Sequence, residues 1–128
     1  MKEFTIIFII LIIIVGGAIY TNNYLNNSSQ KMVSMLEDLK QKVGHKENNM
    51  EELKTEVEKV YDEWENTEKK WAFIVLHSEL DLIETSFVKM KAQIEEGELK
   101  KSMEEIEASI FLVNHISEKE KFCLKNIF

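Results

Sequence analysis

The residues with the most potential for chemistry lie in the stretch LHSELDLIE, residues 76–84. His77 is followed there by three carboxylates, Glu79, Asp81 and Glu84. On a helix, side chains at positions i, i+4 and i+7 lie above one another, so His77, Asp81 and Glu84 would share a face from which Glu79 points away. An imidazole beside carboxylates can bind a metal ion or transfer protons. The spacing therefore raises a metal site or an acid–base site as a hypothesis.

A metal site needs more ligands than this stretch supplies. Di-iron helical bundles repeat Glu-x-x-His pairs on several helices, and no such pair occurs in the sequence. His115 is the remaining candidate for a second histidine ligand, because His45 lies in a turn beside Gly44. We predict no metal and no cofactor. A hydrogen-bonded cluster that joins His77 or His115 to a neighbouring helix stays open.

The favoured interpretation of the stretch is structural. Leu80 and Ile83 belong to an apolar stripe that must face a core, which places His77, Asp81 and Glu84 at the polar edge of that core. A histidine at such an edge can donate one ring nitrogen to an oxygen acceptor and keep the other toward water.

Other catalytic motifs are absent from the sequence. It contains no Gly-rich phosphate loop and no GxSxG, CxxC or HExxH motif. The single cysteine, Cys123, cannot form an internal disulfide. We expect a packed, inert thiol there, with an intermolecular bridge as the alternative. The protein is predicted not to be an enzyme.

The composition restricts the class of partner. The 128 residues include no proline and only four glycines, and 45% of them are apolar, which favours helices. Every one of the 16 basic residues is lysine, and the formal net charge is −7. Nucleic acid is excluded as a partner, because binding it requires a basic face that neutralises phosphates.

The N-terminal stretch FTIIFIILIIIVGGAIY, residues 4–20, is uncharged and almost entirely aliphatic. As a helix it rises about 26 Å, close to the hydrocarbon thickness of a bilayer. Neither a small-x-small cleavage site nor a lipoprotein cysteine follows it. We predict an uncleaved, single-pass anchor in the cell membrane over residues 1–24. Lys2 precedes the span and Lys31 is the next lysine, which favours a short cytoplasmic stub and an extracytoplasmic body.

The residues that follow the span form the predicted junction with the body. Tyr20 and Tyr24 would lie at the membrane interface. The polar residues 25–31 are predicted to form a juxtamembrane connector. Ser28 or Ser29 could cap a new helix there, or the anchor helix could simply run on.

The body, residues 32–128, carries apolar side chains at steps of three and four, as amphipathic helices do. The stripes are Met32, Met35, Leu36, Leu39 and Val43; Leu53, Val57, Val60, Trp64, Trp71 and Ile74; Leu76, Leu80, Ile83, Phe87, Met90 and Ile94; and Leu99, Met103, Ile106, Ile110 and Val113. The predicted fold class is all-α: an N-terminal transmembrane helix followed by a small antiparallel bundle of three to four amphipathic helices. Trp64 and Trp71, at heptad spacing, are candidate core residues or candidate partner-binding aromatics.

The helix boundaries follow from local signals. Gly44 is expected to end the first body helix as a C′ residue. A turn is predicted over residues 45–49, with a capping box from Asn49 to Glu52. A bend or break is predicted within residues 72–78. Gly97 is expected to stop the next helix, and Ser117 with Glu120 resembles a last capping box.

The order of these features resembles a family of small proteins of unknown function from spore-forming, low-GC Gram-positive bacteria. The shared pattern consists of a span ending GGAIYTNNYL, W-x6-W at Trp64 and Trp71, H-x-E-x-D-x-x-E from His77 to Glu84, and a terminal HISEKEKFCLKNIF. The resemblance runs across nearly the whole chain through loose motifs. It implies a membrane-anchored helical domain that works beside another integral membrane protein, and it supplies no catalytic residues.

These features predict a membrane-tethered, non-enzymatic interaction or accessory module. Its partner would be a membrane protein or further copies of the same chain. The alternative is a ligand or metal sensor that uses His77, Asp81, Glu84 and His115.

Overall fold

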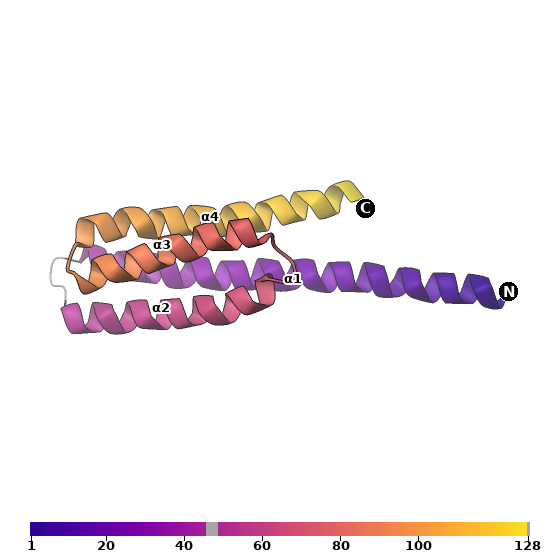
Figure 1. Ribbon diagram of the computed structural model, residues 1–128, viewed down its shortest axis with the longest axis horizontal. Helices are drawn as coiled ribbons and strands as arrows, with labels where there is room; N and C mark the ends of the chain where they lie inside the picture. The colour runs from indigo at the N-terminus through magenta and orange to yellow at the C-terminus, as the bar shows by residue number, and fades with distance from the viewer. Residues whose placement is uncertain (46–48, 128) are drawn as a thin grey trace.

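The chain folds into an antiparallel bundle of helices. The computed structural model describes residues 1–45 and 49–127, and these residues form four α-helices and no strand. Helix α1 spans Lys2–Gly44, α2 spans Met50–Trp71, α3 spans His77–Glu95 and α4 spans Leu99–Ile127. Helices α2 and α4 each pack against both α1 and α3. Figure 1 shows the alternating direction of the helices and the N-terminal part of α1, which projects from one end of the bundle. The predicted all-α fold is confirmed.

One continuous apolar core fills the space between the four helices. Its largest fully buried side chains are Trp64, Trp71 and Phe87. Most of the other buried residues come from the predicted stripes. Those from the stripes are Met32, Leu36, Leu39, Val43, Leu53, Val57, Val60, Leu80, Ile83, Met90, Ile94, Ile106 and Val113. Burial of these side chains is the main favourable term in folding, at about 25 cal/mol per Å² of apolar surface.

Helix α1 passes without a break from its apolar segment into the bundle. Residues 25–31, predicted as a connector, are helical, and Leu25 and Ser29 among them are buried. The core therefore begins at Leu25 and not at residue 32. Ser28 and Ser29 cap no new helix; their hydroxyls donate to backbone carbonyls three or four residues earlier, at 2.8 and 2.9 Å. Such back-bonding satisfies the hydroxyls inside a helix that runs on.

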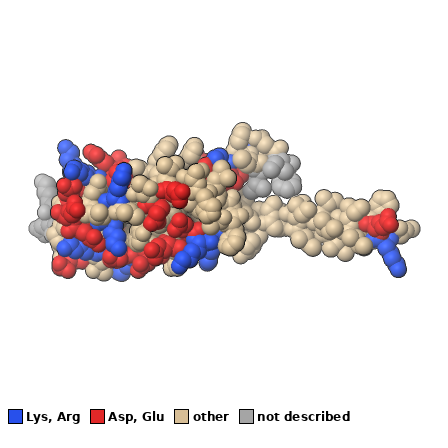
Figure 2. Space-filling model, viewed as in Figure 1, with Lys and Arg blue, Asp and Glu red and all other residues tan. Residues whose placement is uncertain are grey.

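Residues 4–20 of α1 lie outside the core. Within the described part of the chain, α1 is the one helix that is long and apolar enough to cross a membrane. Its most apolar 18-residue window has a mean hydropathy of 2.7, and none of that window is buried. Figure 2 shows this segment as an uncharged rod that carries charge only at its tip. Length and composition thus suit a membrane span.

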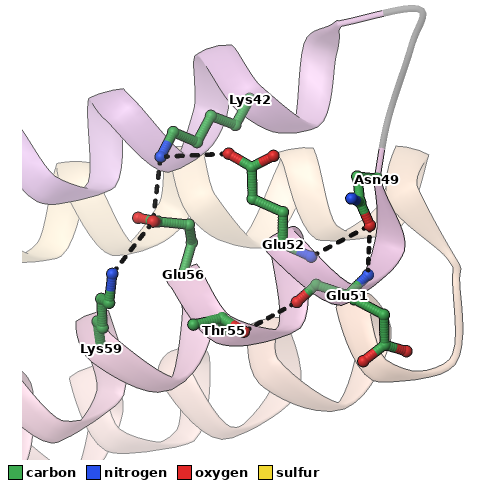
Figure 3. Close-up of polar contacts among 7 residues, drawn as sticks. All are labelled: Lys42, Asn49, Glu51, Glu52, Thr55, Glu56 and Lys59. Atoms are coloured by element: carbon green, nitrogen blue, oxygen red, sulfur yellow. Dashed lines mark hydrogen bonds and ion pairs between the residues drawn. The ribbon is translucent and has the colours of Figure 1, made fainter.

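Helix α2 begins at the predicted cap. The Asn49 side-chain oxygen accepts from the backbone N–H groups of Glu51 and Glu52, at 3.1 and 3.4 Å. Lys42 of α1 reaches across to Glu52 at 4.0 Å and to Glu56 at 3.1 Å (Figure 3). The hydrogen bond from Lys42 is the main reason why the pKa of Glu56 is lowered. Exposed ion pairs contribute about 0–1 kcal/mol each, so this contact orients the two helices more than it stabilises them.

The predicted glycine stops differ in outcome. Gly97 has a φ of +78°, its N–H donates to the Ile94 carbonyl at 3.1 Å, and the Glu98 N–H donates to the Gln93 carbonyl at 2.8 Å. These two bonds form a Schellman motif, so the predicted stop after α3 is confirmed. Gly44 is the last residue of α1, but Gly97 is the only described glycine with a positive φ. The predicted left-handed C′ role of Gly44 is therefore wrong.

The remaining boundary predictions are decided by the extent of the helices. The predicted break within residues 72–78 is confirmed, because α2 ends at Trp71 and α3 begins at His77. The predicted cap at Ser117 and Glu120 is wrong, because both residues lie inside α4 and Ser117 is buried. Of the turn predicted over residues 45–49, residues 46–48 lie outside the described part of the chain.

The Gly97 stop gives a direct test of the fold. Gly97→Ala should lower the free energy of unfolding by about 1 kcal/mol, because an alanine in the left-handed region is strained. Gly44→Ala is the matched control: a Cβ at position 44 would meet the Met103 side chain at an ordinary 3.9 Å. Thermal unfolding of the full chain followed by circular dichroism measures both changes. Equal effects of the two substitutions would contradict the assigned conformation of Gly97.

Candidate functional site

The four residues of the predicted polar cluster differ in their surroundings. His77 is the first residue of α3 and is exposed, as is Asp81, whereas Glu84 is half-buried. His115 is exposed on α4, where its ring stacks on Phe111 with the centroids 5.8 Å apart. Among the described residues, no group of three or more His, Cys, Asp or Glu side chains is arranged to hold a metal ion.

Glu84 lies at the centre of a cluster that joins α3 to α2. The Tyr61 hydroxyl donates to one carboxylate oxygen of Glu84 at 2.6 Å, and the Trp64 indole N–H donates to the other at 2.6 Å. Tyr61 and Trp64 can both reach it because residues three apart lie on one face of α2. The ammonium of Lys91 lies 4.9 Å from the centroid of the Tyr61 ring. Both oxygens of Glu84 are therefore used in contacts between helices.

The electrostatics of this cluster hold the Tyr61 phenol in its protonated form. The hydrogen bond to Glu84, with burial second, raises the pKa of Tyr61 from 10.0 to about 12. On the same side of the bundle, burial raises the pKa of Glu68, and the negative charges of Glu84 and Asp81 add to that rise. Near neutral pH, Tyr61 is thus a hydrogen-bond donor and not an acid–base group.

The two tryptophans connect this cluster to the core and to α1. Trp64 stacks on Phe87 with centroids 5.2 Å apart, and it meets Trp71 edge-on at 5.9 Å. The Trp71 indole N–H donates to the Ser28 hydroxyl of α1 at 2.8 Å. Both indoles are fully buried. Their geometry is that of core residues with satisfied polar groups.

A second polar contact joins α3 to α4. The hydroxyls of Ser86 and Ser109 lie 2.9 Å apart, and Ser86 also donates to the Glu105 carboxylate at 3.1 Å. The sequence pattern did not point to these residues or to Tyr61, and it suggested Ser28 only as a possible helix cap. The available signal was the spacing of small polar residues on the inner faces of the helices, such as Ser102 and Ser109, both of which are buried.

Cys123 is exposed near the end of α4. The expectation of a packed thiol is therefore wrong. Residues 121–123 are all exposed, and α4 has there passed Ile116 and Ser117, which are buried on its inner face.

A model of a protein family, described as a domain of unknown function (DUF4363), matches residues 19–127. The chain belongs to this family. The DUF4363 match covers the helical bundle and begins six residues before Leu25, where the core starts. Comparisons with curated proteins and with solved structures found no match. The family assignment thus defines a domain and leaves its activity unassigned.

The Glu84 cluster predicts a pH dependence. Folding raises the pKa of Tyr61 from 10.0 to about 12, so the stabilisation by its protonated hydroxyl is complete below about pH 10 and is lost as the pH rises through about 12. Glu84→Gln removes the carboxylate charge, and the pKa of Tyr61 should fall toward 10. A titration of tyrosinate absorbance in the full chain measures this shift, with Tyr61→Phe to identify the band. An unchanged high-pH titration in Glu84→Gln would contradict the assigned hydrogen bond.

Proposed function

We propose that this DUF4363 protein is a single-pass, membrane-tethered, non-enzymatic module whose bundle assists a membrane protein partner or other copies of the chain. The observation that carries the tether is the exposure of residues 4–20, which are uncharged and project from the bundle. A rod of this kind is costly to leave in water, and its length suits the hydrocarbon layer of a bilayer.

The lysine distribution supports an orientation for the tether. Lys2 precedes the apolar segment, and the next lysine is Lys31, in the bundle. The positive-inside rule then favours a cytoplasmic N-terminus and an extracytoplasmic bundle. Labelling of a single cysteine at position 100, in Lys100→Cys with Cys123→Ser, by a membrane-impermeant maleimide in intact cells tests this orientation. Labelling only after lysis would reverse it.

The use of the inner polar groups supports a non-enzymatic role. The Glu84 carboxylate, the Trp71 indole and the Ser86 hydroxyl each bond to a neighbouring helix. Groups used in this way fix the packing of the helices and leave little capacity for a substrate. The alternative, a metal or ligand sensor, would need His77 and His115 at one site; both side chains are exposed, and the His115 ring stacks on Phe111 of its own helix.

The tether predicts the behaviour of the chain in membrane fractions. The full-length protein should stay in the membrane pellet after alkaline carbonate extraction. Ile10→Lys with Ile13→Lys should release it, because each lysine at the centre of a span costs about 2.5–3.5 kcal/mol. Both positions are exposed, so the bundle should still fold. The control Ile10→Leu with Ile13→Leu should remain in the pellet. Release of the wild-type chain by carbonate would refute the tether.

The partner is predicted to contact an exposed face of the bundle. Phe111 on α4 is 67% exposed and stacks only on His115 among the ring contacts of the described residues. A photo-crosslinking amino acid at position 111 of the full chain, activated in native membranes, should give one discrete adduct with an integral membrane protein or with a second copy. The same probe at position 101 is the control. Identical adduct patterns at both positions would argue against a specific face.

A further inference from the structure

The bundle end next to the projecting segment exposes apolar side chains. Phe73 is 91% exposed and Leu76 is 64% exposed in the turn between α2 and α3, and Phe122 on α4 is 66% exposed. The sequence pattern assigned Leu76 to the buried α3 stripe, but it is the N-cap residue of α3 and lies before the packed turns. Figure 1 shows the α2–α3 turn and the end of α4 on the side from which α1 projects.

Helix α1 leaves no spacer between the apolar segment and the bundle. Tyr20 closes the apolar segment, and Leu25 is already fully buried in the core. Five helical residues rise about 7.5 Å. The headgroup layer on one side of a bilayer is about 5–7 Å thick, since headgroups add about 10–15 Å to a hydrocarbon core of about 30 Å. A chain whose residues 4–20 span the bilayer therefore has this bundle end at the headgroup layer.

Two contacts fix the end of α2 at this level. The Trp71 indole is bonded to Ser28, and the Lys70 ammonium lies 5.7 Å from the centroid of the Tyr24 ring. The turn that carries Phe73 follows directly. It therefore lies beside the segment of α1 that enters the headgroup layer.

Exposed lysines lie close in sequence to these apolar residues. Lys69 and Lys70 lie in the last turn of α2, and Lys121 and Lys125 lie near the end of α4; all four are exposed. Acidic residues are also present, with Glu118 exposed and Glu79 paired with Lys119. At the opposite end the exposed charges near Gly97 are of both signs: Glu95, Glu96 and Glu98 lie beside Lys100 and Lys101, and Lys101 pairs with Glu98. In Figure 2 charged atoms crowd the half of the bundle away from the projecting segment.

We propose that Phe73, Leu76 and Phe122, with the lysines close to them in sequence, form a docking end that lies in the headgroup layer of an anionic bilayer. The inference rests on the proposed tether. Apolar side chains gain burial at the boundary of the acyl chains, and lysines lie near lipid phosphates with their stems along apolar surface. The docking end of the bundle would thus contact the membrane surface, and the sides of the bundle would stay accessible to a partner.

Fluorescence quenching in vesicles tests the docking end. The full chain is reconstituted at fewer than one copy per vesicle, in equal parts of phosphatidylcholine and phosphatidylglycerol. A polarity-sensitive dye on Cys123 reports quenching by lipids that carry a nitroxide near the headgroup. The far-end control carries the dye on Lys100→Cys, with Cys123→Ser. Flotation of the vesicles after a carbonate wash reports the tether separately.

The dye on Cys123 should be quenched and the dye at position 100 should not. Phe73→Ser, Leu76→Ser and Phe122→Ser together should reduce the quenching to about half or less, because their burial is lost. Phe111→Ser, at the same exposure on the side of α4, should leave it unchanged. Circular dichroism checks that each variant keeps its helices.

Three results would overturn the docking end. In the first, the chain floats with the vesicles, but the dye on Cys123 is not quenched or is quenched equally in the triple variant and in Phe111→Ser. The docking end is then wrong and the tether stands. If quenching appears only when many chains share a vesicle, a second copy covers the apolar residues instead. If the wild-type chain does not float, the proposed tether itself fails.

Discussion

Helix α1 is one continuous helix whose two parts need different surroundings, and the rest of the structure depends on that constraint. Over residues 4–20, α1 is apolar on every side, whereas from Leu25 onward only one face is apolar. A helix that is amphipathic needs a partner for its apolar stripe, and a helix that is apolar all round needs an apolar medium. Helices α2 and α4 supply the partner, and only for the second part of α1. The change takes place within a single turn, residues 21–24.

The interfaces between the helices combine apolar packing with a few polar contacts at fixed points. The Trp71–Ser28 bond joins α2 to α1, the Glu84 contacts join α3 to α2, and Ser86 with Ser109 joins α4 to α3. Apolar packing alone tolerates a shift of one helix along another, whereas a buried hydrogen bond is lost on such a shift and leaves an unsatisfied group. These contacts therefore select one register for the three helix pairs that they join. They explain why titratable and polar side chains lie inside a bundle without forming a reaction site.

Much of the fold was predictable because burial and glycine conformation act locally. The stripe through Trp64 and Trp71, the Asn49 cap and the Gly97 stop each depend on residues within one or two turns. The contacts of Glu84 were not predictable, because its partners lie 20 and 23 residues earlier in the chain. Leu76 continued the spacing of its stripe but fell in a turn, since periodicity does not say where a helix begins.

The continuity of α1 also sets how motion could pass through the molecule. In an α-helix each added residue turns the following part by about 100° and advances it by about 1.5 Å. Between Gly17 and Gly44 helix α1 contains no glycine or proline. This part of the helix therefore resists twisting. A rotation or axial displacement of residues 4–20 would be transmitted to all sides of the bundle at once. The direction in which each face of the bundle points is thus fixed by the rotation of the apolar segment about the axis of α1.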